Sequence, residues 1–186
     1  MHYRRTILKT VLLIAIPIFI VQASFAQQQT IQSFIPKNFK LLDSASGDFN
    51  EDGNKDVILL LDSNQVGDTR PLLILLGNAD KQFILFARND SIVLCKFCGG
   101  VCCDPYSHVV VKKEYFSIEH YGGDNNERWT RIITFKFDKT TGQFVLHKDA
   151  TVYEDISDNP AKKNQYQDNN KIDFDKLAFS KYSNAR

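Results

Sequence analysis

The segment 48–56, which reads DFNEDGNKD, carries oxygen-bearing side chains at its positions 1, 3, 5 and 9 and a glycine at position 6. Alternate side chains of a tight loop can point inward together, and glycine permits the sharp turn that brings the chain back. Calcium is a hard cation that takes six to eight oxygen ligands. The segment therefore predicts a calcium loop. Its ligands would be the side chains of Asp48, Asn50, Asp52 and Asp56 and the backbone carbonyl of Asn54.

The surroundings of this segment distinguish it from an EF-hand. An EF-hand needs a bidentate glutamate at loop position 12, whereas that position is Leu59, inside an apolar run. The phrase from Gly47 to Val57 resembles instead the Asp-x-Asn-x-Asp-Gly-x-x-Asp loops of FG-GAP/VCBS-type repeats. That resemblance implies a structural calcium loop between two strands. A β-propeller needs several blades, and the sequence has one such loop, so neither a propeller nor an adhesion role follows. The alternative is an Asn- and Asp-rich turn that binds no metal.

A second resemblance extends over the rest of the chain. The phrases at 34–37, 71–75 and 120–123 are similar to phrases in secreted bacterial proteins of uncharacterised activity. This resemblance implies export and carries no activity.

Four cysteines fall between positions 95 and 103, and three kinds of chemistry compete for them. In an oxidising compartment they would form disulfides: Cys95 or Cys98 with one of the later two, or Cys95 with Cys98. The spacing also admits a zinc site, although four ligands so close together are cramped. A thioredoxin-like Cys-x-x-Cys opens a helix, and Gly99-Gly100 is a poor helix start. We expect a disulfide among Cys95, Cys98, Cys102 and Cys103, with free or partly paired thiols as a further alternative.

Acid- and base-capable side chains are also dense in the segment 119–127, which contains Glu119, His120, Asp124 and Glu127. In a periplasmic enzyme, His120 or Glu119 would be the general base. The simpler interpretation is a polar hairpin loop with a half-buried histidine. No Ser-His-Asp signature, phosphate loop or His-x-x-His spacing accompanies the segment. The sequence assigns no catalytic residue and favours a non-enzymatic binding or structural role.

Aromatic side chains near this segment raise one further possibility. Trp129, Tyr115 and Tyr121 could form a platform on which a sugar stacks, although such aromatics more often belong to the core of a sheet.

Short strand-like runs bounded by turn residues dominate the chain, so we predict a mainly β fold. The apolar runs 57–61 and 72–76 suit strands that are buried on both faces. In 128–137, Trp129, Arg131, Ile133, Phe135 and Phe137 share one face, which predicts an aromatic core face. The arrangement would be an antiparallel sheet, a sandwich or a partial barrel, after a short helical turn at 30–35. Further strands are expected at 39–42, 82–88, 91–94, 108–113, 115–120 and 143–148, with a hairpin-like turn at 89–90 and a hairpin at 138–142.

The two ends of the chain differ in composition from its centre. Basic residues, an apolar run and small residues before Gln27 predict a cleavable signal peptide at 1–26 and a periplasmic or secreted location. One domain, 27–186, would remain. Its segment 155–171 is polar and predicts a loop, and 172–179 predicts a last strand or short helix.

Charge narrows the range of partners without identifying one. Cleavage would remove three basic and no acidic residues, so the totals of 23 and 22 become 20 and 22, a net charge of −2. This balance gives no reason to expect nucleic acid or an anionic membrane surface as a partner. No later segment is apolar enough to span a bilayer.

Overall fold

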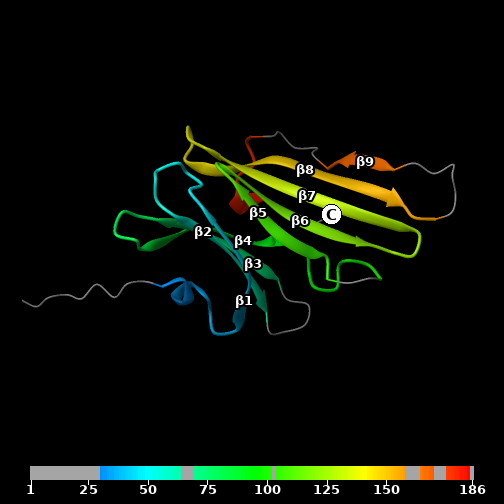
Figure 1. The fold of residues 1–186 in the computed structure, drawn as a ribbon, viewed down its shortest axis with the longest axis horizontal. Helices are drawn as coiled ribbons and strands as arrows, with labels where there is room; N and C mark the ends of the chain where they lie inside the picture. Colours follow the sequence, from blue (N-terminus) through cyan, green and yellow to red (C-terminus); the bar gives the residue numbers. More distant parts are fainter. Residues whose placement is uncertain (1–29, 64–68, 102–103, 158–163, 170–174, 185–186) are drawn as a thin grey trace, which may run out of the picture.

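The chain folds as two open antiparallel sheets packed face to face, a sandwich-like arrangement (Figure 1). This computed structural model describes residues 30–63, 69–101, 104–157, 164–169 and 175–184. The predicted mainly β fold is confirmed. The short N-terminal helical turn is the 3-10 helix η1 (Ile31–Phe34). The predicted signal peptide lies outside the described residues.

The first sheet is a four-stranded meander in which each strand pairs with the next one along the chain. Its strands are β1 (Phe39–Gly47), β2 (Asp56–Ser63), β3 (Arg70–Gly77) and β4 (Phe83–Val93). The second sheet is a five-stranded meander of β5 (Tyr106–Lys112), β6 (Tyr115–Gly123), β7 (Glu127–Asp138), β8 (Gln143–Asp155) and β9 (Gln165–Asp168). The second 3-10 helix, η2 (Phe179–Lys181), follows near the C-terminus.

The main core fills the space between the sheets, and a smaller one lies on the outer face of the first sheet. Ile58, Ile74 and Phe135 belong to the main core. Leu59 and Leu73 belong to the outer cluster, against which η1 packs. Side chains of a strand alternate between its faces, and both faces of β2 and β3 are covered, which accounts for the unbroken apolar runs 57–61 and 72–76 within them. The prediction from the runs 57–61 and 72–76 is confirmed.

Aromatic rings provide much of the main core. Phe116 and Phe135 stack at 5.4 Å between ring centroids, and Phe144 meets Phe116 edge to face at 5.3 Å. Both geometries are favourable for aromatic pairs. Phe135 and Ile133 are buried on the predicted face of β7, whereas Trp129 and Phe137, at its two ends, are half-buried.

Two local predictions were wrong. Residues 89–90 form no turn, because β4 runs through them: the buried Asn89 amide donates to the backbone carbonyls of Phe179 (2.5 Å) and Tyr182 (2.9 Å). The polar segment 155–171 is not a loop throughout, since β9 pairs with β8 as a wholly exposed edge strand. For 172–179, predicted as a last strand or a short helix, the described part 175–179 contains no strand: Ala178 makes a single bridge to Val145, and the short 3-10 helix η2 begins at Phe179.

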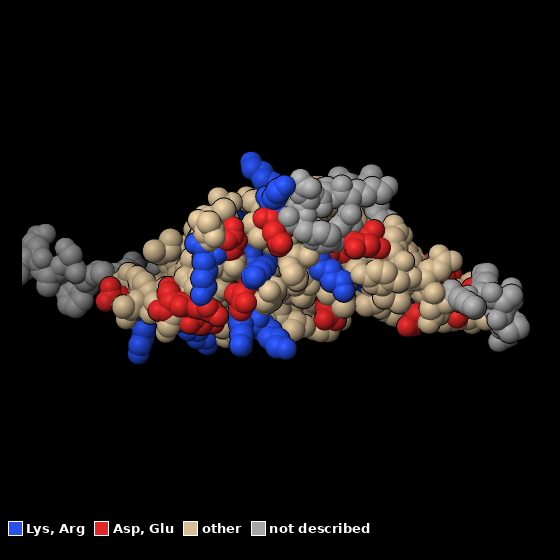
Figure 2. Space-filling view, turned by 90° about the horizontal axis from the view of Figure 1, so that it is seen from above, with Lys and Arg blue, Asp and Glu red and all other residues tan. Residues whose placement is uncertain are grey.

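The surface shows no concentration of one charge on the side in view in Figure 2. Lys and Arg side chains are interspersed there with Asp and Glu side chains. Among the described residues, no helix has the length and apolar character needed to cross a membrane.

Candidate functional site

The predicted calcium loop connects β1 to β2, two antiparallel neighbours in the first sheet. The chain turns sharply in it: Glu51 has φ of 58° and Gly53 has φ of 84°, both in the left-handed region that favours glycine. Gly53 therefore has the conformational role that the sequence predicted. An L-residue such as Glu51 rarely adopts this conformation, so the loop is held in shape by other contacts.

Those contacts are hydrogen bonds from the loop's own backbone to its side-chain oxygens. Asp48 accepts from the N–H groups of Asp52 (3.0 Å) and Gly53 (2.9 Å). The carboxylate of Asp52 accepts from the N–H of Asn54 (2.8 Å) and the amide of Asn50 (2.9 Å). These hydrogen bonds hold the pKa of Asp52 below its usual value. Three of the predicted ligands, at positions 1, 3 and 5, are therefore gathered in one bend.

Asp56 differs from the other loop carboxylates because its residue is completely buried. Its two oxygens accept from the N–H groups of Phe49 (2.8 Å) and Gly77 (2.9 Å). Burial raises the pKa of Asp56, these two hydrogen bonds lower it, and the negative charges of Asp52 and Asp48 raise it further, with a net upward shift. The ionised form of Asp56 is therefore disfavoured by its surroundings.

The donor set suits a hard divalent cation in chemistry and charge. Among the described residues, no Lys, Arg or His forms an ion pair with Asp48, Asp52 or Asp56. Lys139 pairs with Glu51, which is not one of the predicted ligands. In the arrangement described, no three His, Cys, Asp or Glu side chains of the described residues converge as a metal cluster. The loop oxygens are instead directed at backbone N–H groups.

The cysteine segment forms one of the predicted disulfides, between Cys95 and Cys98. Cys102 and Cys103 lie outside the described residues. The segment after the disulfide packs against the second sheet: the N–H of Gly123 donates to the Gly99 carbonyl (3.0 Å), and the N–H of Val101 donates to the Gly123 carbonyl (3.2 Å). The disulfide thus closes a short loop whose far side is attached to the end of β6.

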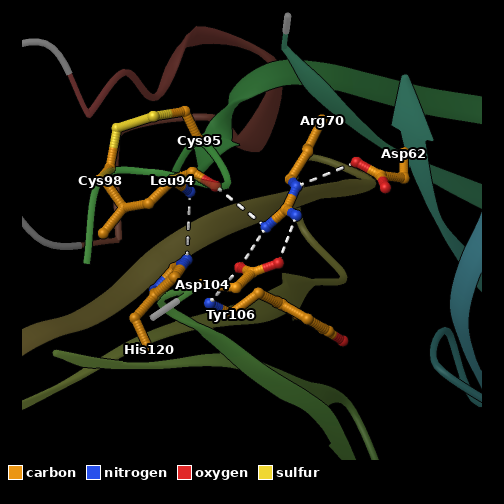
Figure 3. The surroundings of a disulfide bond; sticks show 8 residues. All are labelled: Asp62, Arg70, Leu94, Cys95, Cys98, Asp104, Tyr106 and His120. Atoms are coloured by element: carbon orange, nitrogen blue, oxygen red, sulfur yellow. Dashed lines mark hydrogen bonds and ion pairs between the residues drawn. A yellow bond between two sulfur atoms is a disulfide. The ribbon is translucent and has the colours of Figure 1, made fainter. Parts of the chain in front are cut away.

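A buried arginine, Arg70, lies at the other end of the disulfide loop, where it donates to the backbone carbonyl of Leu94 at 3.5 Å (Figure 3). Arg70, at the start of β3, is 1% exposed and donates to both oxygens of Asp104, at 2.6 and 2.5 Å. It also donates to Asp62 of β2 at 3.3 Å. Burial by itself would raise the pKa of Asp104, but Arg70 outweighs this effect and holds the pKa below its usual value. This network was not predicted from the sequence; the available signal was a charged residue, Arg70, shortly before the apolar run 72–76.

His120 lies beside this network and has no exposed surface. Its Nε2 accepts from the N–H of Leu94 (3.3 Å), so its proton is on Nδ1, which has no hydrogen-bond partner among the described residues. Burial, followed by the positive charge of Arg131, lowers the pKa of His120 to about 4. The imidazole is therefore neutral at pH 7 and enclosed by protein. The expectation of a half-buried histidine was wrong, since the side chain faces the core.

The other acid- and base-capable residues of 119–127 do not gather around His120. Glu119 precedes His120 on the opposite face of β6, and its carboxylate lies 3.3 Å from the ring of His108. Asp124 accepts from the N–H groups of Asn126 and Glu127 in the turn between β6 and β7. These contacts support the interpretation of a hairpin loop. The structure does not bring the four side chains into one site.

A second buried ion pair, which the sequence analysis also missed, lies on the inner face of β7 and β8. Arg131 donates from Nε and Nη2 to the two oxygens of Asp149, at 2.8 and 2.7 Å. The Tyr182 hydroxyl also donates to Asp149, at 2.7 Å. Burial by itself would raise the pKa of Asp149, but these donors keep it below its usual value. Arg131 on an otherwise aromatic strand face was the signal for this pair.

Comparison with known proteins identified no relative of this chain. No protein family matches the chain, and neither the curated proteins nor the solved structures contain a match.

Proposed function

We propose that this chain is an exported β-sandwich module that is stabilised by calcium in the loop 48–56 and acts by binding or as a structural part, without catalysis. The observation that carries the proposal is Asp56: a completely buried carboxylate, close to Asp48 and Asp52, that forms no ion pair with a cationic side chain of the described residues. A buried charge without a counter-charge is costly, and a divalent cation would supply that counter-charge.

Five loop residues would coordinate the ion. Asp48, Asn50, Asp52 and Asp56 would contribute side-chain oxygens, and Asn54 its backbone carbonyl. Three carboxylates exceed the charge of one Ca²⁺, so the loop without metal retains like charges that repel one another. Bound calcium would remove this repulsion and stabilise the folded chain relative to the unfolded chain, because binding to the native state alone raises its stability.

We propose no catalytic role because His120, the candidate general base, is enclosed by protein. His120 is enclosed, its Nε2 accepts a backbone N–H, and Glu119 lies on the other face of the sheet. A general base must reach its substrate within hydrogen-bond distance.

Thermal unfolding with and without calcium tests the metal part of the proposal. Millimolar CaCl₂ should raise the melting temperature of the wild-type chain, because extracellular calcium modules bind with Kd of roughly 10⁻⁴–10⁻³ M. Asp52→Ala should abolish the rise. Asp80→Ala, in an exposed turn between β3 and β4, is the matched control and should retain it. An equal rise in Asp52→Ala and wild type would refute the assignment.

Export has its own test. The full chain should be expressed in a bacterium with an outer membrane, and the periplasmic fraction and the medium should be examined. Mature protein beginning at Gln27, identified by N-terminal sequencing, is the expected result. Uncleaved protein retained in the cytoplasm would contradict the export part of the proposal and leave the calcium part intact.

A further inference from the structure

The inner face of the second sheet continues past the end of the first sheet (Figure 1). Along β7 this face carries the buried Phe135 and Ile133, then Arg131, and finally Trp129. The register places Arg131 opposite Thr151 and Trp129 opposite Tyr153 on β8. Residues directly opposite each other on neighbouring strands share a face. The apolar core therefore passes into a polar pair and then into two aromatic side chains that the first sheet does not cover.

A cavity of about 280 Å³ lies at this position. Its lining combines side chains of β7 and β8 with residues of two other segments, one next to the disulfide and one near the C-terminus. The lining residues are Leu94, Trp129, Arg131, Thr151, Tyr153 and Asn184.

Three polar groups of these side chains have no hydrogen-bond partner in the part of the chain that the structure describes. Arg131 uses Nε and Nη2 for Asp149 and Tyr182, and no hydrogen bond within the described residues uses Nη1. The same holds for the indole N–H of Trp129 and the hydroxyl of Tyr153, both on half-buried residues. Such groups usually find a partner when they leave water. The cavity therefore offers donors to a ligand.

The charge at the cavity favours a neutral ligand. Arg131 is the only charged residue among the six that line it, and Asp149 balances that charge through two hydrogen bonds. An anion would have to compete with Asp149, whereas a hydroxyl group can accept from Nη1 without disturbing the pair. This excludes a carboxylate or phosphate as the preferred occupant.

The indole of Trp129 is held in place from behind. A Cβ atom at Gly122 would come within 2.3 Å of its Cζ2 and within 2.6 Å of the Gly99 carbonyl oxygen. The ring thus packs directly on a glycine backbone that the disulfide-closed loop supports. A rigid aromatic ring costs little conformational entropy when a ligand binds to it.

We propose that this cavity binds one neutral saccharide ring. Aromatic faces accommodate the apolar C–H face of a sugar, and the free donors of Arg131, Trp129 and Tyr153 suit its hydroxyl oxygens. The cavity is slightly smaller than the ~300 Å³ at which pockets for drug-sized ligands begin, so it suits a single ring. Tyr115 and Tyr121, which the sequence grouped with Trp129, take no part: Tyr115 packs on His147, and Tyr121 is exposed on the opposite face of the sheet.

This saccharide site does not depend on the calcium proposal. Glu51 of the calcium loop is paired with Lys139, just beyond one end of β7, and Trp129 lies near the other end. Ten residues of strand separate Trp129 from Lys139, or roughly 33 Å. Failure of one proposal therefore leaves the other standing.

Titration with simple sugars tests the site, and the chain supplies its own probe because Trp129 is its single tryptophan. The probes are the methyl glycosides of glucose, galactose, mannose and N-acetylglucosamine, with sodium acetate and sodium phosphate as anion controls. At least one glycoside should change the tryptophan emission saturably, and isothermal titration calorimetry should give the same Kd. The response should persist in Asp52→Ala, which alters only the calcium loop.

Variants of Tyr153 locate the binding. Tyr153→Ala should weaken the glycoside about tenfold, which corresponds to about 1.4 kcal/mol. Tyr153→Phe, which keeps the ring and loses the hydroxyl, should weaken it less. Tyr166→Phe, on the exposed edge strand β9, is the control and should bind as wild type. Absence of a saturable response to all four glycosides, a response to the anions alone, or unchanged affinity in Tyr153→Ala would overturn the proposal.

Discussion

Asp56 accepts a 2.9 Å hydrogen bond from the backbone N–H of Gly77, 21 residues along the chain. This contact links the end of the loop 48–56 to the end of β3. Glycine is needed there because an added Cβ would come within 2.3 Å of the Lys55 carbonyl oxygen. The structure thus explains how a carboxylate at the start of β2 is buried and oriented by backbone N–H groups.

Gly77→Ala should destabilise the fold by about 1–3 kcal/mol, because the new methyl group overpacks a backbone contact. It should also reduce the rise in melting temperature that calcium produces, since Asp56 would be displaced. Thermal unfolding with and without CaCl₂ measures both effects. Gly142→Ala is the control. The backbone φ of 64° at this position strains an alanine, but the added Cβ would have no atom within 4 Å. A normal calcium response in Gly77→Ala would show that Gly77 does not position Asp56.

The Arg131–Asp149 pair should be strongly coupled. Arg131→Met should cost about 3–5 kcal/mol, because it leaves the buried carboxylate of Asp149 without its counter-charge. The double variant Arg131→Met/Asp149→Leu should recover much of that loss. Urea denaturation of the wild type and the variants, Asp149→Leu included, gives the coupling energy. If the losses in free energy of unfolding of the two single variants simply added in the double variant, the account of the pair would be contradicted.

His120 should make the fold sensitive to mild acid. Its pKa is about 4 in the folded state and about 6.5 in the unfolded state. Between these values the unfolded chain binds more protons, so the free energy of unfolding falls as the pH drops from 6.5 to 4. The loss from this group should approach about 3 kcal/mol. Asp149 and Asp104, whose pKa values are held low, add losses at more acidic pH.

Unfolding by urea at several pH values separates His120 from these carboxylates. His120→Gln, which keeps an acceptor for the N–H of Leu94, should flatten the dependence between pH 6.5 and 4. His147→Gln, at an exposed site, is the control and should retain it. The same slope in His120→Gln as in wild type would assign the effect to other groups.

The sequence was sufficient to predict elements that follow a local pattern. The alternation of β7 and the apolar runs of β2 and β3 predicted their strands because side-chain period and burial are local properties. The same reasoning failed at Asn89, whose amide is held by carbonyls about 90 residues away in the chain. A residue pair typical of turns was retained in a strand by a tertiary contact.

The candidate sites show the same difference between local patterns, which the sequence predicts, and contacts between distant segments, which it does not. The spacing from Asp48 to Asp56 predicted one bend because its members are neighbours in the chain. The Arg70–Asp104 and Arg131–Asp149 pairs join different segments of the chain, and their partners were not evident before the fold was known. Gly77 was missed for the same reason.

The most direct test of the calcium loop is a high-resolution crystal structure of the protein grown in millimolar calcium. One ion should lie among Asp48, Asn50, Asp52, Asn54 and Asp56, with oxygens about 2.3–2.6 Å from it. The same side chains directed only at the backbone N–H groups of the loop, with no ion between them, would contradict the account.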